Sequence, residues 1–264
     1  MSRTRTLVGV VVAALGVSVA LIGCPSNTSP PAPPPASGGA PGAAPAPPAA
    51  APSGPAAAAG FGSIKGRVIN KRSVKPPEPE KVTKDPEVCG ETHDPGSLKL
   101  GSDGAVESCV VYVKGPQAPA DWKKGGTYVV DQKTCHYTPR VIIVPVGESV
   151  TFTSQDDVLH NVKSGYQSFN EAVTKGSEHK LVCKEPTIAG LECNVHPFMK
   201  GLLVVAEHPW YVLTDATGGY KLEHVPAGTW HLFAHHEVLG KADKKGADVT
   251  VTADKETVVD IQFD

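Results

Sequence analysis

Short runs of apolar or β-branched residues recur from residue 61 onward, separated by segments that contain Gly, Pro or Asp. Residues of this kind in runs of four to seven are typical of strands in antiparallel sheets. The clearest candidates are 63–69, 109–113, 128–131, 141–144, 149–153, 202–206, 230–234 and 249–251. The best helical candidate, 169–175, is too short to organise a core. The pattern therefore predicts an all-β protein built from sandwiches.

The first sixty residues have a different pattern. Arg3 and Arg5 precede an apolar run that ends in Leu-Ile-Gly-Cys at 21–24. This resembles a bacterial lipoprotein signal, which implies a signal peptide at 1–23 and acylation of Cys24. An uncleaved membrane anchor is the alternative, although the run is short for a spanning helix.

Residues 24–60 are almost entirely Pro, Ala, Gly and Ser, a composition that cannot form a packed core, so they are predicted to be a disordered tether. The protein would then be lipid-anchored in the cell envelope and face the periplasm or the extracellular side. A net charge of −2 gives no sign of nucleic-acid binding.

Separate segments of the folded region share one resemblance. The runs 62–68, 110–113, 214–222 and 225–230 resemble strands and turns of a carboxypeptidase-regulatory-like (transthyretin-like) domain. Their spacing suggests one domain with parts at 61–115 and 209–264, separated by residues 116–208. Two domains in tandem are the alternative.

The intervening segment carries two motifs in order. Cys193-Asn-Val-His196-Pro-Phe-Met199 follows Leu159-His160-Asn-Val, which itself follows the strand-like run 146–152. Together they resemble the ligand segments of the cupredoxin (blue copper) family, of the amicyanin or plastocyanin kind. The resemblance implies one type I copper held by His160, Cys193, His196 and Met199. Two imidazoles, a thiolate and a weak axial thioether suit both oxidation states of copper.

The predicted fold is thus a Greek-key cupredoxin sandwich at 116–208, inserted in or joined to a small transthyretin-like sandwich. The family resemblance also implies that an edge of His196, flanked by Pro197 and Phe198, is exposed as the point where electrons leave. One departure is Ser154, six residues before His160, where cupredoxins often have an Asn that ties the two ligand loops together.

The cysteine count is consistent with a thiolate ligand. If Cys24 is acylated, an odd number remains, so at least one has no partner within the chain. Cys193 is the expected unpaired one, although a disulfide with Cys183 is an alternative. The other four are Cys89, Cys109, Cys135 and Cys183, which are expected to form up to two disulfides of undetermined connectivity.

His231, His235, His236 and Glu237 could form a second metal site, but solvated or edge-strand side chains are expected because no cysteine or second spaced carboxylate completes the set. The resemblances imply a carrier of single electrons between extracytoplasmic redox proteins, and not an enzyme. Two other functions remain open. One is copper storage or delivery, and the other is a surface binding module with a structural metal.

Overall fold

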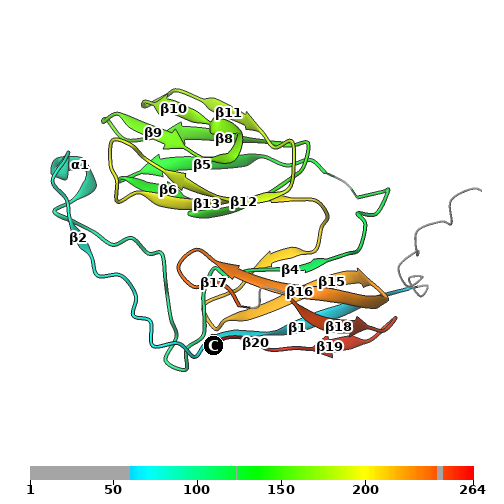
Figure 1. Cartoon of the computed structure of the whole chain (residues 1–264). Helices are drawn as coiled ribbons and strands as arrows, with labels where there is room; N and C mark the ends of the chain where they lie inside the picture. Colours follow the sequence, from blue (N-terminus) through cyan, green and yellow to red (C-terminus); the bar gives the residue numbers. More distant parts are fainter. Residues whose placement is uncertain (1–59, 123, 243–245) are drawn as a thin grey trace, which may run out of the picture. The chain divides into compact units, whose positions relative to one another are not determined.

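The computed structural model describes residues 60–122, 124–242 and 246–264. The predicted signal peptide at 1–23, the acylation site Cys24 and the tether, except for residue 60, lie outside these ranges. Within them, no helix has the length and apolar character needed to cross a bilayer. Nearly all regular structure is strand, which confirms the all-β fold class (Figure 1).

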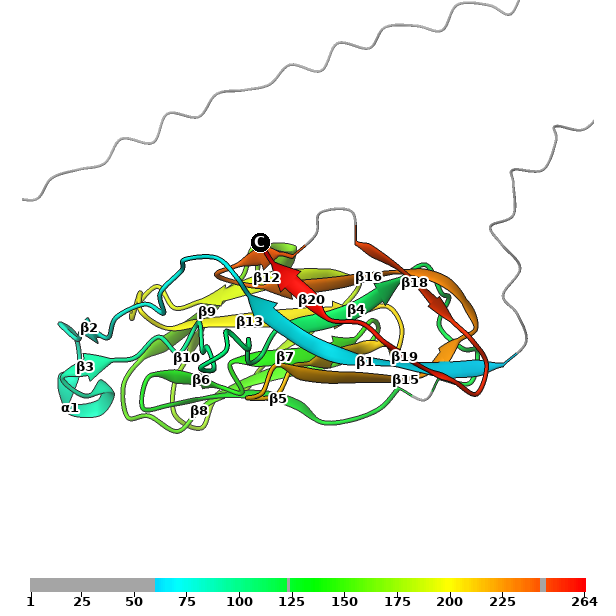
Figure 2. The same ribbon diagram turned by 90° about the horizontal axis from the view of Figure 1, so that it is seen from below.

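Strands from the two ends of the folded region share two sheets. In one, β1 (Phe61–Asn70) lies between β15 (Gly219–Pro226) and β19 (Glu256–Val258), as Figure 2 shows, and also pairs with β20 (Ile261–Phe263). The other has the order β14-β4-β16-β17, with β18 also paired to β16. Its strands are β4 (Val110–Lys114), β14 (Tyr211–Leu213), β16 (Gly228–His236), β17 (Gly240–Lys241) and β18 (Ala247–Val251).

Strands between β4 and β14 pair only among themselves. One sheet has the order β10-β9-β12-β13-β7 and the other the order β11-β8-β5-β6. The first comprises β7 (Val141–Pro145), β9 (His160–Lys163), β10 (Asn170–Val173), β12 (Thr187–Glu192) and β13 (Lys200–Ala206). The second comprises β5 (Tyr128–Lys133), β6 (His136–Thr138), β8 (Ser149–Ser154) and β11 (His179–Val182), and a 3-10 turn, η1 (Tyr166–Ser168), precedes β10.

The long connection from β1 to β4 contains a small hairpin, which we call the cap and define as residues 80–93. It comprises β2 (Glu80–Lys81), α1 (Pro86–Cys89) and β3 (Thr92–His93), with β2 and β3 paired antiparallel. Buried Val82 and Cys89 belong to the same hydrophobic core as the strands of the middle segment. The cap is therefore packed against the β5–β13 sandwich although it precedes β4 in the chain.

The uninterrupted apolar runs of β4 and β13 follow from burial on both faces. Alternate residues of β4, Val111 and Val113, face the core of the β1-containing sandwich, while Val110 and Tyr112 join a third cluster. That cluster also contains Leu202 and Val204 of β13, whose neighbours Leu203 and Val205 face the other core. Since side chains alternate between the two faces of a strand, a strand that is buried on both faces has apolar residues at successive positions.

Candidate metal centre

The connection between β12 and β13 carries three of the predicted ligands. The two strands pair antiparallel, with Glu192 opposite Lys200, so residues 193–199 form the loop that joins them. Strand β9 begins at His160 and pairs with β12 through Lys163 and Glu192. His160 therefore reaches the loop from the neighbouring strand, which is how residues more than thirty positions apart meet.

Two imidazoles and a thiol converge in the interior. Nδ1 of His160 lies 3.1 Å from Nδ1 of His196, and Sγ of Cys193 lies 3.9 Å from the same Nδ1 of His196. All three ligand atoms lie within 4.8 Å of one another. The exposed fractions of His160, His196 and Cys193 are 0%, 0% and 2%.

Each imidazole is held at its far nitrogen by a carboxylate. Nε2 of His160 lies 2.8 Å from Oδ2 of Asp156, and Nε2 of His196 lies 2.9 Å from Oδ2 of Asp85. Carboxylates in this position fix the orientation and tautomer of metal-binding histidines. When both Nε2 atoms donate to the carboxylates, both Nδ1 atoms of the neutral rings present lone pairs to one point. A soft cation beside the Cys193 sulfur fits this donor set.

Asp156 is itself fixed by the backbone. Its carboxylate accepts hydrogen bonds from the N–H groups of Thr134 and Cys135, at 2.7 and 2.9 Å. Burial would raise the pKa of Asp156, but these N–H groups and His160 lower it below the usual value. The ionised carboxylate is the form that accepts a hydrogen bond from His160.

Met199, the fourth predicted ligand, is also buried at the end of this loop. It is 1% exposed, belongs to the same hydrophobic core as Cys193 and directly precedes β13. Its backbone N–H donates to the carbonyl oxygen of His196 at 2.9 Å, which closes the loop into a turn. The loop therefore carries a buried thioether three residues after His196 and six residues after Cys193.

A pair of asparagines, which the sequence analysis missed, ties the two ligand segments together. The N–H of Asn194 donates to Oδ1 of Asn161 at 3.2 Å, and Nδ2 of Asn161 donates to the carbonyl oxygen of Glu171 at 3.0 Å. Ser154, the expected replacement, instead accepts a hydrogen bond from the N–H of Asp156 at 3.2 Å. The available signal was an Asn directly after His160 and another directly after Cys193.

The predicted exposure of His196 is wrong because the cap covers this ring. Asp85 reaches Nε2 of His196 from a left-handed backbone conformation, with φ of 52°, at the start of α1. His93 of β3 packs on Phe198, with ring centroids 4.5 Å apart. Of the residues expected at the exposed edge, Pro197 is exposed, but Phe198 is only 8% exposed and His196 is fully buried.

One disulfide joins the cap to the sandwich. Cys89 of α1 bonds to Cys135, with Cα atoms 5.1 Å apart, while Cys109, Cys183 and Cys193 are free and buried. The prediction thus permitted two disulfides, and the structure has this one among the described residues. The alternative bond between Cys183 and Cys193 does not form. Burial raises the pKa of the Cys183 thiol to about 11, so it is protonated at neutral pH.

The histidines near the end of β16 form no metal-binding group in the described part of the chain. Nδ1 of His231 lies 2.6 Å from Oδ1 of Asp248, and Nδ1 of His236 accepts a hydrogen bond from the N–H of Val238 at 3.3 Å.

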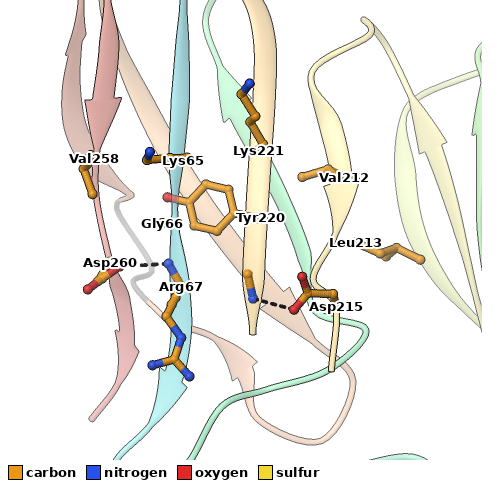
Figure 3. A pocket seen from close by; sticks show the side chains of 11 residues that line it. Lys65, Gly66, Arg67, Val212, Leu213, Asp215, Tyr220, Lys221, Val258 and Asp260 are labelled. Carbon is orange, nitrogen blue, oxygen red and sulfur yellow. Dashed lines mark hydrogen bonds between the residues drawn. The ribbon is translucent and has the colours of Figure 1, made fainter. Parts of the chain in front are cut away.

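A hollow of about 620 Å³ lies over β1 and β15 (Figure 3). Its polar groups have partners within the protein. The N–H of Arg67 donates to Asp260 at 2.8 Å, and Tyr220 donates its hydroxyl proton to the carbonyl oxygen of Val259 at 2.6 Å. Asp215 accepts the N–H of Gly219 at 2.9 Å. The hollow offers no comparable set of converging ligands.

Comparisons with known proteins match part of the chain. No family model matches the chain. The sequence is 29% identical over 113 residues to amicyanin from Paracoccus denitrificans, covering 40% of this chain and 86% of that protein. This match supports a cupredoxin-like region.

Two solved structures also resemble part of the chain. A purple cupredoxin from Nitrosopumilus maritimus is 26% identical, with 31% of this chain and 100% of that chain covered and a TM-score of 0.28. A copper-containing nitrite reductase from Thermus scotoductus is 22% identical, with 36% and 28% covered and a TM-score of 0.31. At these TM-scores neither structure defines the fold of this chain.

Proposed function

We propose that the cupredoxin-like region holds one type I copper ion through His160, Cys193, His196 and Met199, and that the protein carries single electrons. The observation that carries the proposal is the convergence of two Nδ1 atoms and one Sγ within 4.8 Å at a buried point. The sequence match to amicyanin agrees with it.

Copper bound there would supply a one-electron couple, since imidazole and sulfur ligands accommodate both of its oxidation states. The protein's part is to hold the ligands in one arrangement. Asp156 and Asp85 fix the two imidazoles, and the hydrogen bond from Asn194 to Asn161 fixes one loop against the other. Ligands held in this way move little between oxidation states, which favours fast electron transfer.

Burial favours a carrier over copper storage or delivery. The proposed ligands are at most 2% exposed, and the disulfide to Cys135 fastens the cap over His196. A protein that delivers copper must open its site to a recipient, whereas a carrier retains its ion through many cycles. Slow removal of copper by an external chelator is the expected behaviour.

We further propose an extracytoplasmic setting. Acylation at Cys24 would anchor the protein to a membrane, and the Pro- and Ala-rich tether would let the folded part reach redox proteins that donate and accept electrons. The cupredoxin region would be inserted in a transthyretin-like sandwich. Pairing of β1 with β15 and of β4 with β16, on either side of the middle strands, supports the insertion.

The test is the visible and electron paramagnetic resonance spectrum of the purified protein after addition of Cu(II). We expect an intense blue thiolate-to-copper band and narrow copper hyperfine splitting. Both should be lost in Cys193→Ser and kept in Cys183→Ser, which changes another buried free cysteine of the same core. A pale spectrum that is the same in both variants would refute the proposal.

A further inference from the structure

The cap separates His196 from any docking partner. His196 is 0% exposed, and its outer nitrogen bonds Asp85 of the cap. The cap cannot swing away freely, since Val82 and Cys89 are buried in the core and Cys89 is bonded to Cys135. If the site carries electrons as proposed above, they must cross this layer.

Four aromatic rings form a continuous series of contacts through the layer, tilted at the first two contacts and stacked at the last, which we call the stack. The ring centroids of His196 and Phe198 lie 5.6 Å apart, those of Phe198 and His93 lie 4.5 Å apart, and those of His93 and His136 lie 4.1 Å apart. The last two rings are inclined by only 20° and are stacked. The stack therefore begins at a proposed ligand and ends at His136 of β6.

Only the last ring of the stack is exposed. His93 is 2% exposed and Phe198 is 8% exposed, whereas His136 lies at the surface. His136 also lines a hollow of about 360 Å³ together with Lys99, Glu107 and Arg140. A side chain of a docked protein could enter this hollow and contact the ring of His136.

His93 is placed as a neutral ring within the layer. Its Nε2 lies 3.2 Å from the carbonyl oxygen of Cys135, and its Nδ1 is buried without a hydrogen-bond partner. Burial and the adjacent His136 lower the pKa of His93 to about 4, so the ring is uncharged at neutral pH. A buried nitrogen without a partner costs stability, yet the ring stays packed against both Phe198 and His136.

We infer that electrons enter and leave this protein at His136, through the stack of His93 and Phe198, and that a one-electron redox protein docks on the surface around His136. The inference rests on the proposed function. One electron passes from the donor to the copper site, so the donor is oxidised by one electron as the site is reduced. The acceptor reverses the change. No bond forms or breaks, and the rings return to their original state.

The test places a ruthenium photoreductant on a surface histidine of the copper-loaded protein and measures electron transfer to the site. The label is attached at His136 in one preparation and at partly exposed His179 of β11 in another. We expect His93→Leu to slow transfer from the His136 label severalfold and leave transfer from the His179 label unchanged. His93→Phe keeps an aromatic ring and should retain the rate.

Equal rates in His93→Leu and the unaltered protein, with the label at His136, would overturn the inference. The copper spectrum of each variant separates the two ideas. If the site is blue but His93→Leu leaves the rate of electron transfer from the His136 label unchanged, only the route is refuted. If the unaltered protein forms no blue site, the proposed function is refuted and the route with it.

A second measurement needs no copper. In the metal-free protein, diethylpyrocarbonate should modify His136 and spare His93 and His196, as read by mass spectrometry of peptides. Modification of His196 as fast as His136 would show that the cap does not close the ring, and the inference would fail. This measurement also applies if His93→Leu does not fold.

Discussion

At the scale of single residues, the convergence of His160, Cys193 and His196 could be predicted because each lies in a motif that is local in sequence. Cys193, His196 and Met199 lie in one loop, and the residues around His160 supply a second motif. Asp85 could not be found in this way, since it lies more than one hundred residues from His196. Its carboxylate reaches the ring only through the packing of the cap, which no local pattern reports.

Asn161 links the two ligand segments, and its removal should be costly. Asn161→Ala removes the acceptor of the Asn194 N–H and the two donors to Asn170 and Glu171. We expect a loss of about 1–3 kcal/mol in the free energy of unfolding of the metal-free protein, measured with urea. Asn170→Ala, which changes an exposed partner, should cost less. Equal stability of Asn161→Ala and the unaltered protein would contradict the assignment.

His236 should make the metal-free protein less stable in acid. Burial, with Arg140 and His235 nearby, lowers its pKa from 6.5 to about 4. Between these values the unfolded chain binds a proton that the folded protein does not, so stability falls as the pH falls from 6.5 toward 4. His236→Gln should remove up to about 3 kcal/mol of this fall.

The control is His231→Gln, which alters a side chain that is 57% exposed. Urea unfolding at pH 7 and pH 4.5 should show nearly the full pH dependence in this variant. A pH dependence that His236→Gln leaves unchanged would exclude the proposed origin of the effect.

At the scale of elements, strands with strong apolar patterns were the predictable ones. Every predicted run overlaps a strand, including β1, β4 and β13. Strands such as β9 and β10 were missed because they are short and carry His160, Asn161 and Asn170, whose contacts are set by the site. The cap was missed for a similar reason, since its two-residue strands are stabilised by a disulfide and by packing.

Removal of the disulfide should loosen the cap. Cys89→Ser with Cys135→Ser opens a link between residues 46 positions apart, for which a loss of about 2–5 kcal/mol in stability is expected. In the folded metal-free protein, a thiol reagent should then modify Cys193 faster, while Cys183 changes little. If Cys193 reacts at the same rate with and without the disulfide, the cap is not what protects the site.

At the scale of the whole described molecule, one apolar cluster connects the two pairs of sheets. Tyr112 of β4 and Phe233 of β16 stack with centroids 5.3 Å apart and share this cluster with Val204 of β13. A partly buried ion pair between Arg140 and Glu237 lies across the same connection. The sequence showed the apolar runs but not their partners, since long-range pairing of buried faces leaves no local signal.

Phe233→Ala should weaken this connection. The side chain is 8% exposed, and loss of a buried Phe costs about 3–5 kcal/mol. In calorimetry we expect one cooperative transition in the unaltered metal-free protein and two separated transitions in the variant. Leu222→Ala, which lies in the core of the β1-containing sandwich alone, should lower the temperature of a single transition. A single transition in Phe233→Ala would show that the cluster does not couple the two parts.

The most direct test of the central claim is copper K-edge X-ray absorption of the copper-loaded protein, which counts the atoms bound to the metal. Ligation by His160, His196 and Cys193 predicts two imidazole nitrogens and one short copper–sulfur contact, with the sulfur contact absent in Cys193→Ser. A shell of nitrogen and oxygen atoms alone, the same with and without Cys193, would contradict the claim.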